Sequence, residues 1–253
     1  MMEKRNCPGV LFNVRVDEFQ TESAILAVEE LWQQPSASAL YFVNAHCFNI
    51  AQKDQEYHRI LENSAIVLND GSGIAIAGKM AGRPFPENMN GTDFIPMLIA
   101  AAHEKKYAVY VLGGIQEVSD AVREKARRQF PGLVIDSHNG YFDDIEESDI
   151  LEALHKANVK LLVIGMGVPR QEKWIAQNLH CLPPGCVAVA GGGFVDFYAE
   201  RFARAPLWAR KAGVEWLWRL AQEPGRLWKR YVVGNFSFLF RCMRLRLTMK
   251  KNK

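Results

Sequence analysis

A lone carboxylate in front of two glycines is the feature of this chain most suggestive of chemistry. Asp70 precedes Gly71 and Gly73 in the stretch AIVLNDGSGIAIAG (65–78). Glycines after an apolar run are typical of loops that expose backbone N–H groups to a phosphate. A carboxylate would repel phosphate, but it suits a general base that takes a proton from a hydroxyl. A local turn or a helix cap is the alternative role for Asp70, and the stretch alone supports both equally.

Small and polar residues also follow other apolar runs of the chain. They supply backbone N–H groups, amides and an Arg-Gln-Glu cluster, which suit a phosphate-bearing, hydroxyl-rich ligand such as a sugar nucleotide. For His46, ligand contact and a structural role are equally supported. The residues are Asn44 and His46 in NAHCFNIA, Gly113 and Gly114 in YVLGG, Asn139 and Tyr141 in NGYF, Arg170, Gln171 and Glu172 in GMGVPRQEKW, and the glycines of GGGFVDF (191–197).

Alternating strands and helices are expected to position these residues. Repeated strand, crossover and strand units predict a Rossmann-like α/β fold, with a mostly parallel sheet covered by helices on both faces. Ligands bind beyond the carboxyl ends of the strands in such sheets, so the residues above should share one edge. The predicted strands are 39–43, 65–68, 107–112, 133–136, 159–164 and 186–190, and the predicted helices are 21–33, 54–63, 73–81, one from 92 or 93, 118–129 and 150–157.

The charge divides the chain into two parts. Residues 1–199 contain 17 Lys and Arg against 25 Asp and Glu, whereas residues 200–253 contain 14 against 3. Four of the six tryptophans also follow residue 200. The sequence therefore predicts an acidic α/β catalytic domain at 1–199 and a basic, aromatic, helical C-terminal appendage at 200–253, which would seek an anionic partner.

The end of this appendage has a helical apolar pattern. Basic residues with Trp and Phe on one helix favour the membrane interface, whereas no run reaches the roughly 18 apolar residues of a membrane span. Packing of the helix on the domain is the alternative, and both could hold. The apolar residues are Trp228, Val232, Phe236, Leu239, Met243 and Leu247.

Several functional classes lack their motifs. A dinucleotide-binding fingerprint would need a third glycine at position 76, which is Ile76. The histidines form no metal-binding motif, and the acidic run 143–149 is expected to be a solvated loop with a helix cap, so no metal and no cofactor are predicted. The five cysteines, at 7, 47, 181, 186 and 242, form no C-x-x-C and fit a reducing cytoplasm. The charged N-terminus lacks the apolar region of a signal peptide.

The motifs, in their order, resemble those of the WecG/TagA/CpsF family of bacterial glycosyltransferases from about residue 10 to 231. The resemblance implies inverting transfer of a sugar from a UDP-sugar to a polyprenyl-diphosphate-linked sugar, without an essential metal, on an α/β fold distinct from the two commonest glycosyltransferase folds. Known members transfer N-acetylmannosamine, its uronic acid or hexoses into precursors of teichoic acid, enterobacterial common antigen and exopolysaccharides. The matching pieces are NAHCFNIA, LNDGSGIAIA, ENMNGTDF, YVLGG, FPGL, NGYF, GMGVPRQEKW, GGGFVDF, RAPLW and EWLWRLAQEPGRLWKRY.

The resemblance also implies roles for individual residues. Asp70 matches the family's proposed general base, which belongs near the sugar and not against the phosphates. Asn44 matches an amide near the sugar, Gln171 and Glu172 match a motif near the donor or acceptor, and Arg170 would lie near the diphosphate. Without a metal, cations must meet the charge of the leaving group, and each candidate could instead be a solvated residue or an ion-pair partner. The candidates in the appendage are Arg204, Arg219, Arg226 and Arg230.

Two positions depart from the better-known members. Phe42 stands where they have Thr, and Asn88 stands where they have Arg, so the mannosamine assignment does not transfer directly. The departures indicate a divergent subgroup, of the exopolysaccharide type for example, in which His46 could supply replacement polar contacts. The expected location is the cytoplasm, peripheral on the inner face of the membrane, and a homo-oligomer is left open.

Two other functional classes compete with the glycosyltransferase. A nucleotide-dependent oxidoreductase of Rossmann type is disfavoured by the broken glycine pattern. A non-enzymatic nucleic-acid binder would use the basic appendage but would leave Asp70 and the Gln171–Glu172 pair unexplained.

Overall fold

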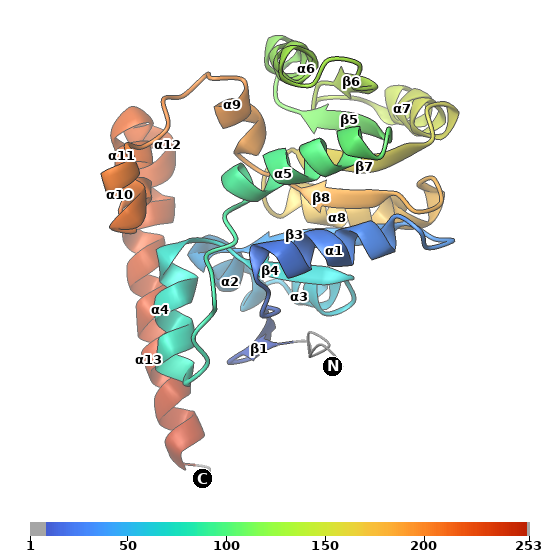
Figure 1. The fold of residues 1–253 in the computed structure, drawn as a ribbon. Helices are drawn as coiled ribbons and strands as arrows, with labels where there is room; N and C mark the ends of the chain where they lie inside the picture. The colour runs from blue at the N-terminus through green and yellow to red at the C-terminus, as the bar shows by residue number, and fades with distance from the viewer. Residues whose placement is uncertain (1–8, 252–253) are drawn as a thin grey trace.

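The computed structural model describes residues 9–251 and confirms the α/β prediction (Figure 1). Its main sheet has six parallel strands in the order β4-β3-β8-β7-β5-β6, and β1 pairs antiparallel with β2 in a separate hairpin. The strands are β1 (Val10–Leu11), β2 (Val14–Arg15), β3 (Ser38–Val43), β4 (Ile66–Asn69), β5 (Ala108–Gly113), β6 (Ile135–His138), β7 (Val159–Gly165) and β8 (Val187–Ala190).

Helices connect the strands and cover both faces of the sheet. A 3-10 turn, η1 (Leu179–Cys181), follows α8, and a π-helical turn, η2 (Lys229–Val233), joins α12 to α13. The helices are α1 (Thr21–Leu31), α2 (Ala45–Ala51), α3 (Gln55–Glu62), α4 (Gly71–Ala81), α5 (Gly91–Glu104), α6 (Gln116–Gln129), α7 (Asp144–Lys156), α8 (Arg170–Asn178), α9 (Phe194–Tyr198), α10 (Leu207–Lys211), α11 (Glu215–Gln222), α12 (Pro224–Trp228) and α13 (Gly234–Lys251).

The alternation of side chains along each strand produces two apolar layers. On β3, Leu40 and Phe42 face the layer that contains α1, α5, α6 and α9, whereas Tyr41 and Val43 face the layer that contains α2, α3, α7 and α8. All four side chains are buried, as expected for a parallel sheet covered on both faces. The carboxyl ends of the six strands therefore meet at one edge, as the sequence predicts.

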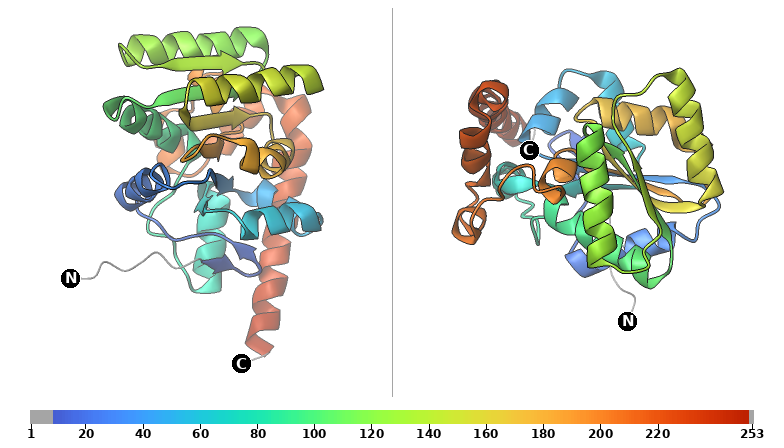
Figure 2. Two further views of the ribbon diagram at one scale, coloured as in Figure 1. Left: turned by 90° about the vertical axis from the view of Figure 1, so that its right-hand side faces the viewer. Right: turned by 90° about the horizontal axis from the view of Figure 1, so that it is seen from above.

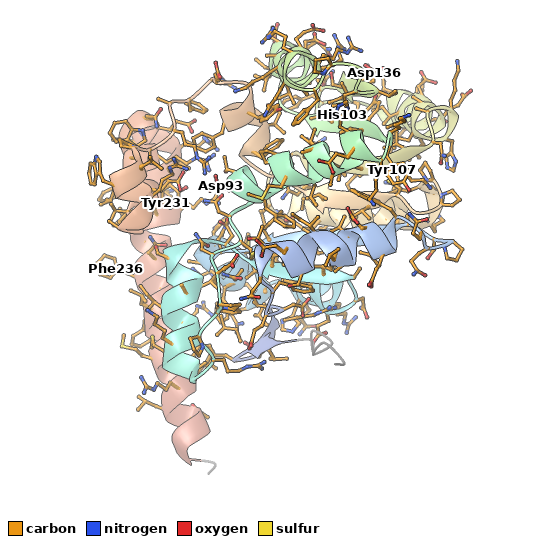
Figure 3. All side chains as sticks on the ribbon, viewed as in Figure 1. Asp93, His103, Tyr107, Asp136, Tyr231 and Phe236 are labelled. Atoms are coloured by element: carbon orange, nitrogen blue, oxygen red, sulfur yellow. The ribbon has the colours of Figure 1, made fainter. Side chains whose placement is uncertain are left out.

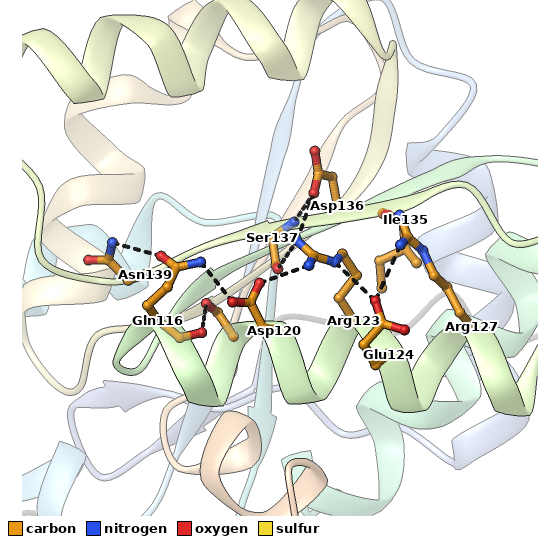
Figure 4. Close-up of polar contacts among 10 residues, drawn as sticks. Gln116, Asp120, Arg123, Glu124, Arg127, Ile135, Asp136, Ser137 and Asn139 are labelled. Atoms are coloured by element: carbon orange, nitrogen blue, oxygen red, sulfur yellow. Dashed lines mark hydrogen bonds and ion pairs between the residues drawn. The ribbon is translucent and has the colours of Figure 1, made fainter.

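A polar network attaches the edge strand β6 to α6 (Figure 4). Asn139 donates from Nδ2 to Oε1 of Gln116 at 3.1 Å, and Gln116 donates to Asp120 at 3.2 Å. Arg123 pairs with Asp120 at 2.9 Å and with Asp136 at 3.4 Å. These contacts fix the loop after β6 relative to the loop after β5.

Three segments differ from the sequence-based prediction. Residues 45–51, where no element is predicted, form α2, and the side chain of Asn44 caps it by accepting N–H bonds from His46 and Cys47. The helix cap predicted in the acidic run 143–149 is confirmed, since Asp143 caps α7 and Glu146 completes a capping box. The loop is wrong, because α7 begins at Asp144 and the carboxylates occupy its favourable first turn. The Arg-Gln-Glu cluster, for which no helix is predicted, begins helix α8.

The C-terminal segment 200–251 forms four helices beside the sheet domain. Figures 1 and 2 show α10, α11 and α12 grouped at one end, and α13 running along α4 and past its end. Phe238 and Cys242 of α13 are fully buried, and Phe238 packs edge-on against Phe48 of α2 with ring centroids 5.2 Å apart. The helix thus packs on the domain, as the alternative prediction for this segment states.

The apolar stripe predicted along the appendage is divided in the structure. Leu239 packs against the core, whereas Phe236, Met243 and Leu247 are exposed. Trp228, which precedes the π-helical turn η2, is exposed as well, so Leu239 is the member of the stripe that turns toward the domain.

The part of the chain that the structure describes contains no candidate membrane span. Within residues 9–251 no helix combines the length and the apolar character needed to cross a bilayer. Four cysteines there, 47, 181, 186 and 242, are free thiols, and Cys7 lies outside the described residues.

Candidate active site

Two cavities meet beyond the carboxyl ends of the strands. The glycine cavity, about 410 Å³, is lined by the loops that follow β5, β6, β7 and β8. The appendage cavity, about 350 Å³, lies between α4 and the C-terminal helices and has Trp216, Tyr231 and Phe238 in its wall. The residues that line both cavities are Asn44, Asp70, Asn90, Thr92, Arg219 and Arg230.

Asp70 is the carboxylate that the two cavities share. It occupies the N-cap position of α4, yet its side chain makes no capping hydrogen bond. Asn88 serves that helix end instead, because its Oδ1 accepts the N–H of Gly71 at 2.7 Å. The capping alternative for Asp70 is therefore wrong, and its carboxylate remains available to a ligand.

The environment of Asp70 favours a proton-accepting role. Burial raises its pKa above the usual value, while the amide of Asn44 and the guanidinium groups of Arg230 and Arg219 oppose that rise. A carboxylate with a raised pKa is a stronger base than a solvated one.

Asn44 holds this carboxylate in place. Its Oδ1 accepts the first free N–H groups of α2, from His46 at 3.0 Å and Cys47 at 3.1 Å, and its Nδ2 donates to Oδ2 of Asp70 at 3.2 Å. Because the helix cap uses the oxygen, the amide nitrogen must face Asp70.

The glycines at the strand ends allow the backbones of neighbouring loops to pack closely against each other. At Gly113, whose φ is +156°, a Cβ would lie 2.6 Å from the backbone of Gly165. Gly140 donates its N–H to the carbonyl of Gly114 at 2.8 Å. Side chains at these positions would separate the loops that form the glycine cavity.

Arginines from the C-terminal helices face the glycine loops. A Cβ on Gly193 would lie 2.4 Å from Arg219, so the absent side chain leaves room for the guanidinium group. Within the described residues, neither Arg219 nor Arg230 forms an ion pair, and Nε of each is buried without a hydrogen-bond partner. Half-buried guanidinium groups that form no ion pair are suited to an anionic ligand.

Another arginine of the same segment has a different partner. Arg204 pairs with Asp93 at 2.6 Å and approaches Glu215 at 3.8 Å, and Arg210 approaches Asp93 at 3.7 Å. Figure 3 shows Asp93 at the end of α5 that faces the C-terminal helices. Arg204 thus attaches those helices to the sheet domain.

His46 lies on the appendage cavity and is uncharged at neutral pH. Burial, aided by the nearby charge of Arg230, lowers the pKa of His46 to about 4. It can therefore offer a neutral hydrogen bond to a ligand, but it adds no positive charge to the site.

Most of the predicted site residues lie in a cavity wall. The residues outside both walls are Gly113, Asn139, Glu172 and Arg204, which hold other parts of the site in place. The residues in one or both walls are Asp70, Asn44, His46, Gly71, Gly114, Tyr141, Arg170, Gln171, Arg219, Arg226 and Arg230.

Sequence reasoning did not single out several residues that the fold brings to the site. Asn90 and Thr92 belong to the motif ENMNGTDF at the start of α5 and line both cavities. Glu215 and Trp216 belong to EWLWRL and line the appendage cavity. The quoted motifs contained the signal, but only the fold shows which of their residues face a cavity. Within residues 9–251, no group of three or more His, Cys, Asp or Glu is arranged to hold a metal ion.

Comparison with known proteins identifies the family. The model of the glycosyl transferase WecG/TagA/CpsF family matches residues 10–252. The chain belongs to this family. It is therefore a glycosyltransferase, and the resemblance stated from its motifs is confirmed.

Curated relatives of this WecG/TagA/CpsF member include proteins named N-acetylglucosaminyldiphosphoundecaprenol N-acetyl-beta-D-mannosaminyltransferase. The relative from Bacillus subtilis (strain 168) is 28% identical over 78% of this chain and 76% of its own length. The relative from Staphylococcus aureus (strain MW2) is 24% identical over 93% of both chains.

Two cavity residues distinguish this family member from the motif pattern given above. Phe42 lines the glycine cavity, contacts Gly91, and packs edge-on against Phe94 with ring centroids 6.3 Å apart. Asn88 provides the hydrogen bond to Gly71 that frees Asp70. Each of these two residues therefore lines a cavity that Asp70 also lines.

Proposed function

We propose that this protein transfers a sugar from a UDP-sugar to a saccharide linked to polyprenyl diphosphate, with inversion at the anomeric carbon. The observation that carries the proposal is the position of Asp70, which no helix cap engages and which lies where the two cavities meet. A donor in one cavity and an acceptor in the other would bring their reacting atoms together at this carboxylate.

The glycine cavity suits the nucleotide donor. Backbone N–H groups of the glycine loops and the guanidinium groups of Arg219 and Arg230 would meet the charge that develops on the departing diphosphate. Such donors supply the stabilisation that a metal ion provides in other transferases, so the proposed reaction needs no metal.

The appendage cavity suits the acceptor. Trp216 and Tyr231 offer aromatic surfaces on which a sugar ring can pack, while Asn90 and Glu215 offer hydrogen-bond partners for hydroxyls. The names of the curated relatives include a diphosphoundecaprenol acceptor, which supports a lipid-linked acceptor for this chain.

Asp70 would act as general base in a single displacement. The acceptor hydroxyl gives its proton to Asp70 as its oxygen attacks the anomeric carbon, and the bond from that carbon to the diphosphate oxygen breaks with its electron pair leaving on UDP. One such displacement inverts the anomeric configuration. Asn44 keeps the carboxylate facing the acceptor oxygen throughout.

The exposed face of α13 would hold the enzyme at the membrane where a lipid-linked acceptor resides. This exposed stripe consists of Phe236, Phe240, Met243 and Leu247 of α13 together with Val233 at the end of η2, and each of these side chains is at least half exposed. Figure 3 shows Phe236 pointing away from the domain. Arg244 and Arg246 are exposed on the same helix, so apolar and electrostatic attraction would act together.

A transfer assay tests the proposal. Purified full-length protein is incubated with a panel of UDP-sugars and a short-chain polyprenyl-diphosphate N-acetylglucosamine acceptor, and products are separated and weighed by mass spectrometry. We expect one UDP-sugar to extend the acceptor by one residue with release of UDP. Extension from a prenyl-monophosphate sugar donor, with none from any UDP-sugar, would contradict the proposal.

A further inference from the structure

Two buried neighbours, Gln171 and Glu172, join the loops that form the glycine cavity. Gln171 is 2% exposed and Glu172 is 1% exposed. The Oε1 of Gln171 accepts the N–H of Gly167 at 3.2 Å and the N–H of Gly192 at 3.1 Å. One amide oxygen therefore ties the loop after β7 to the loop after β8.

The amide of Gln171 can do this in only one of its two orientations. Its Nε2 donates to Oε1 of Glu172 at 2.9 Å, which places the amide oxygen toward the glycines. If the amide turned by 180°, its NH₂ group would face two N–H donors, and its oxygen would face a carboxylate oxygen. Both contacts would then be repulsive.

Glu172 makes no other contact that explains its burial. Its carboxylate lies outside both cavity walls, so a ligand there would not contact it. Its Oε2 is buried with no hydrogen-bond partner among the described residues. Burying a carboxylate costs free energy unless the carboxylate is hydrogen-bonded. The bond from Gln171 is therefore the contact that accounts for a carboxylate at this position.

We infer that Glu172 is a positioning residue that selects the orientation of the Gln171 amide and thereby fixes the spacing between the loops at Gly167 and Gly192. The inference rests on the proposed function in one respect, because these loops would hold the nucleotide donor. The same geometry assigns the amide of Gln171 mainly to the protein backbone, since only one of its N–H bonds stays free for a ligand.

Three variants separate this role from a direct substrate contact. Glu172→Leu removes the acceptor and lets the amide turn. Glu172→Gln keeps an acceptor oxygen at the same place. The exchange Q171E/E172Q reverses the pair, because a carboxylate at 171 accepts both glycine N–H bonds in either orientation and also accepts from the amide at 172.

The measurement is hydrogen exchange of the full-length protein without substrate, followed in the peptides that contain Gly167 and Gly192. Because two backbone hydrogen bonds are weakened, E172L should raise exchange there about tenfold, with the strands of the sheet unchanged. E172Q and Q171E/E172Q should stay within about twofold of the parent. Unchanged exchange in E172L, or loop exchange in the reversed pair as fast as in E172L, would overturn the inference.

Two further readings keep the test decisive. If E172L does not fold, Q171E/E172Q is the deciding variant, because the loops at Gly167 and Gly192 stay protected from exchange in it only if the proposed hydrogen bonds hold them. UDP affinity, measured by calorimetry, should fall about tenfold in E172L and recover in Q171E/E172Q, whereas a role of Gln171 as a substrate contact predicts no recovery. If the parent protein shows no transfer activity, the proposed function is contradicted. The exchange result would still stand as the test of whether Glu172 orients the Gln171 amide.

Discussion

Asn44 donates from Nδ2 to the carboxylate of Asp70 at 3.2 Å while its Oδ1 caps α2. The two roles can be separated by Asn44→Asp, because aspartate caps a helix as well as asparagine does but cannot donate. The added charge should raise the pKa of Asp70 further. We expect the acidic limb of the pH profile of kcat/KM to move upward by about one unit, with a thermal midpoint close to that of the parent.

The control for this variant is Asn44→Ala. It removes the cap as well as the donor, so it should also lower the free energy of unfolding by about 1 kcal/mol. A pH profile of Asn44→Asp that overlays that of the parent would show that the contact does not influence the base.

Arg219 and Arg230 should speed the reaction by stabilising the negative charge that develops on the leaving group. Replacing either with Ala should lower kcat about 10²-fold, because buried donors to a developing anion are worth that much in comparable sites. The matched control is Arg246→Ala on the exposed part of α13, which should leave activity on a water-soluble acceptor unchanged. Steady-state rates of the three variants at saturating substrates check this, and equal rates would exclude the proposed role.

The exposed stripe and the basic residues of α13 should act on membrane binding and not on chemistry. Arg241, Arg244 and Arg246 changed together to Glu should release the protein from vesicles that contain anionic lipid, since each basic residue contributes about 1 kcal/mol near such a surface. Activity on the soluble acceptor should largely survive. Vesicle flotation at moderate salt is the measurement.

A second variant separates apolar from electrostatic attraction. Phe236 and Phe240 changed to Ser leave the charge unchanged and remove two exposed aromatic side chains. It should weaken binding to neutral vesicles as well as to anionic ones. Flotation of both variants at the level of the parent would mean that α13 only packs on the domain.

Glu172 should make stability depend on pH. Burial, opposed by the bond from Gln171 and by the charge of Arg230, raises the pKa of Glu172 to about 7 from 4.5. Between these values the folded protein keeps a proton that the unfolded chain releases, so this group makes the free energy of unfolding fall as pH rises from 4.5 to 7. Chemical denaturation at several pH values should show a smaller fall for Glu172→Gln. An identical fall would mean that Glu172 titrates as a solvated carboxylate.

Metal removal tests whether arginines take the place of a metal ion in this reaction. Activity should be unchanged after dialysis against EDTA and should not rise with added Mg²⁺ or Mn²⁺. Activity that EDTA abolishes and a divalent ion restores would contradict this part of the account.

The sheet and the position of Asp70 at a strand end could be predicted because their signals are local. Val159–Gly165 is a continuous apolar run, and Asp70 stands directly after another. The seven residues of α2 are too few for a periodic pattern, so the helix could be found only from its cap at Asn44. At the start of α7, the Asp143 and Glu146 capping box was present in the sequence, but the density of charge suggested a loop.

The rest of the site depends on contacts between distant segments. Asn88 accepts the N–H of Gly71, which lies 17 positions earlier in the chain, and so caps α4 in place of Asp70; no local pattern reveals that exchange. The same holds for Arg204, which pairs with Asp93 in α5 and lines neither cavity. The face that α13 presents to solvent likewise depends on distant contacts, because Phe238 and Cys242 are buried against the domain.

The central claim is that Asp70 takes the proton of the acceptor, and a single-turnover measurement of Asp70→Asn tests it most directly. Asparagine keeps the size of the side chain and can still contact Asn44, but it cannot accept the proton. With both substrates bound at saturation, the rate of glycosidic bond formation should fall about 10²-fold or more, while UDP affinity stays within about twofold of the parent. A single-turnover rate close to that of the parent would contradict the account.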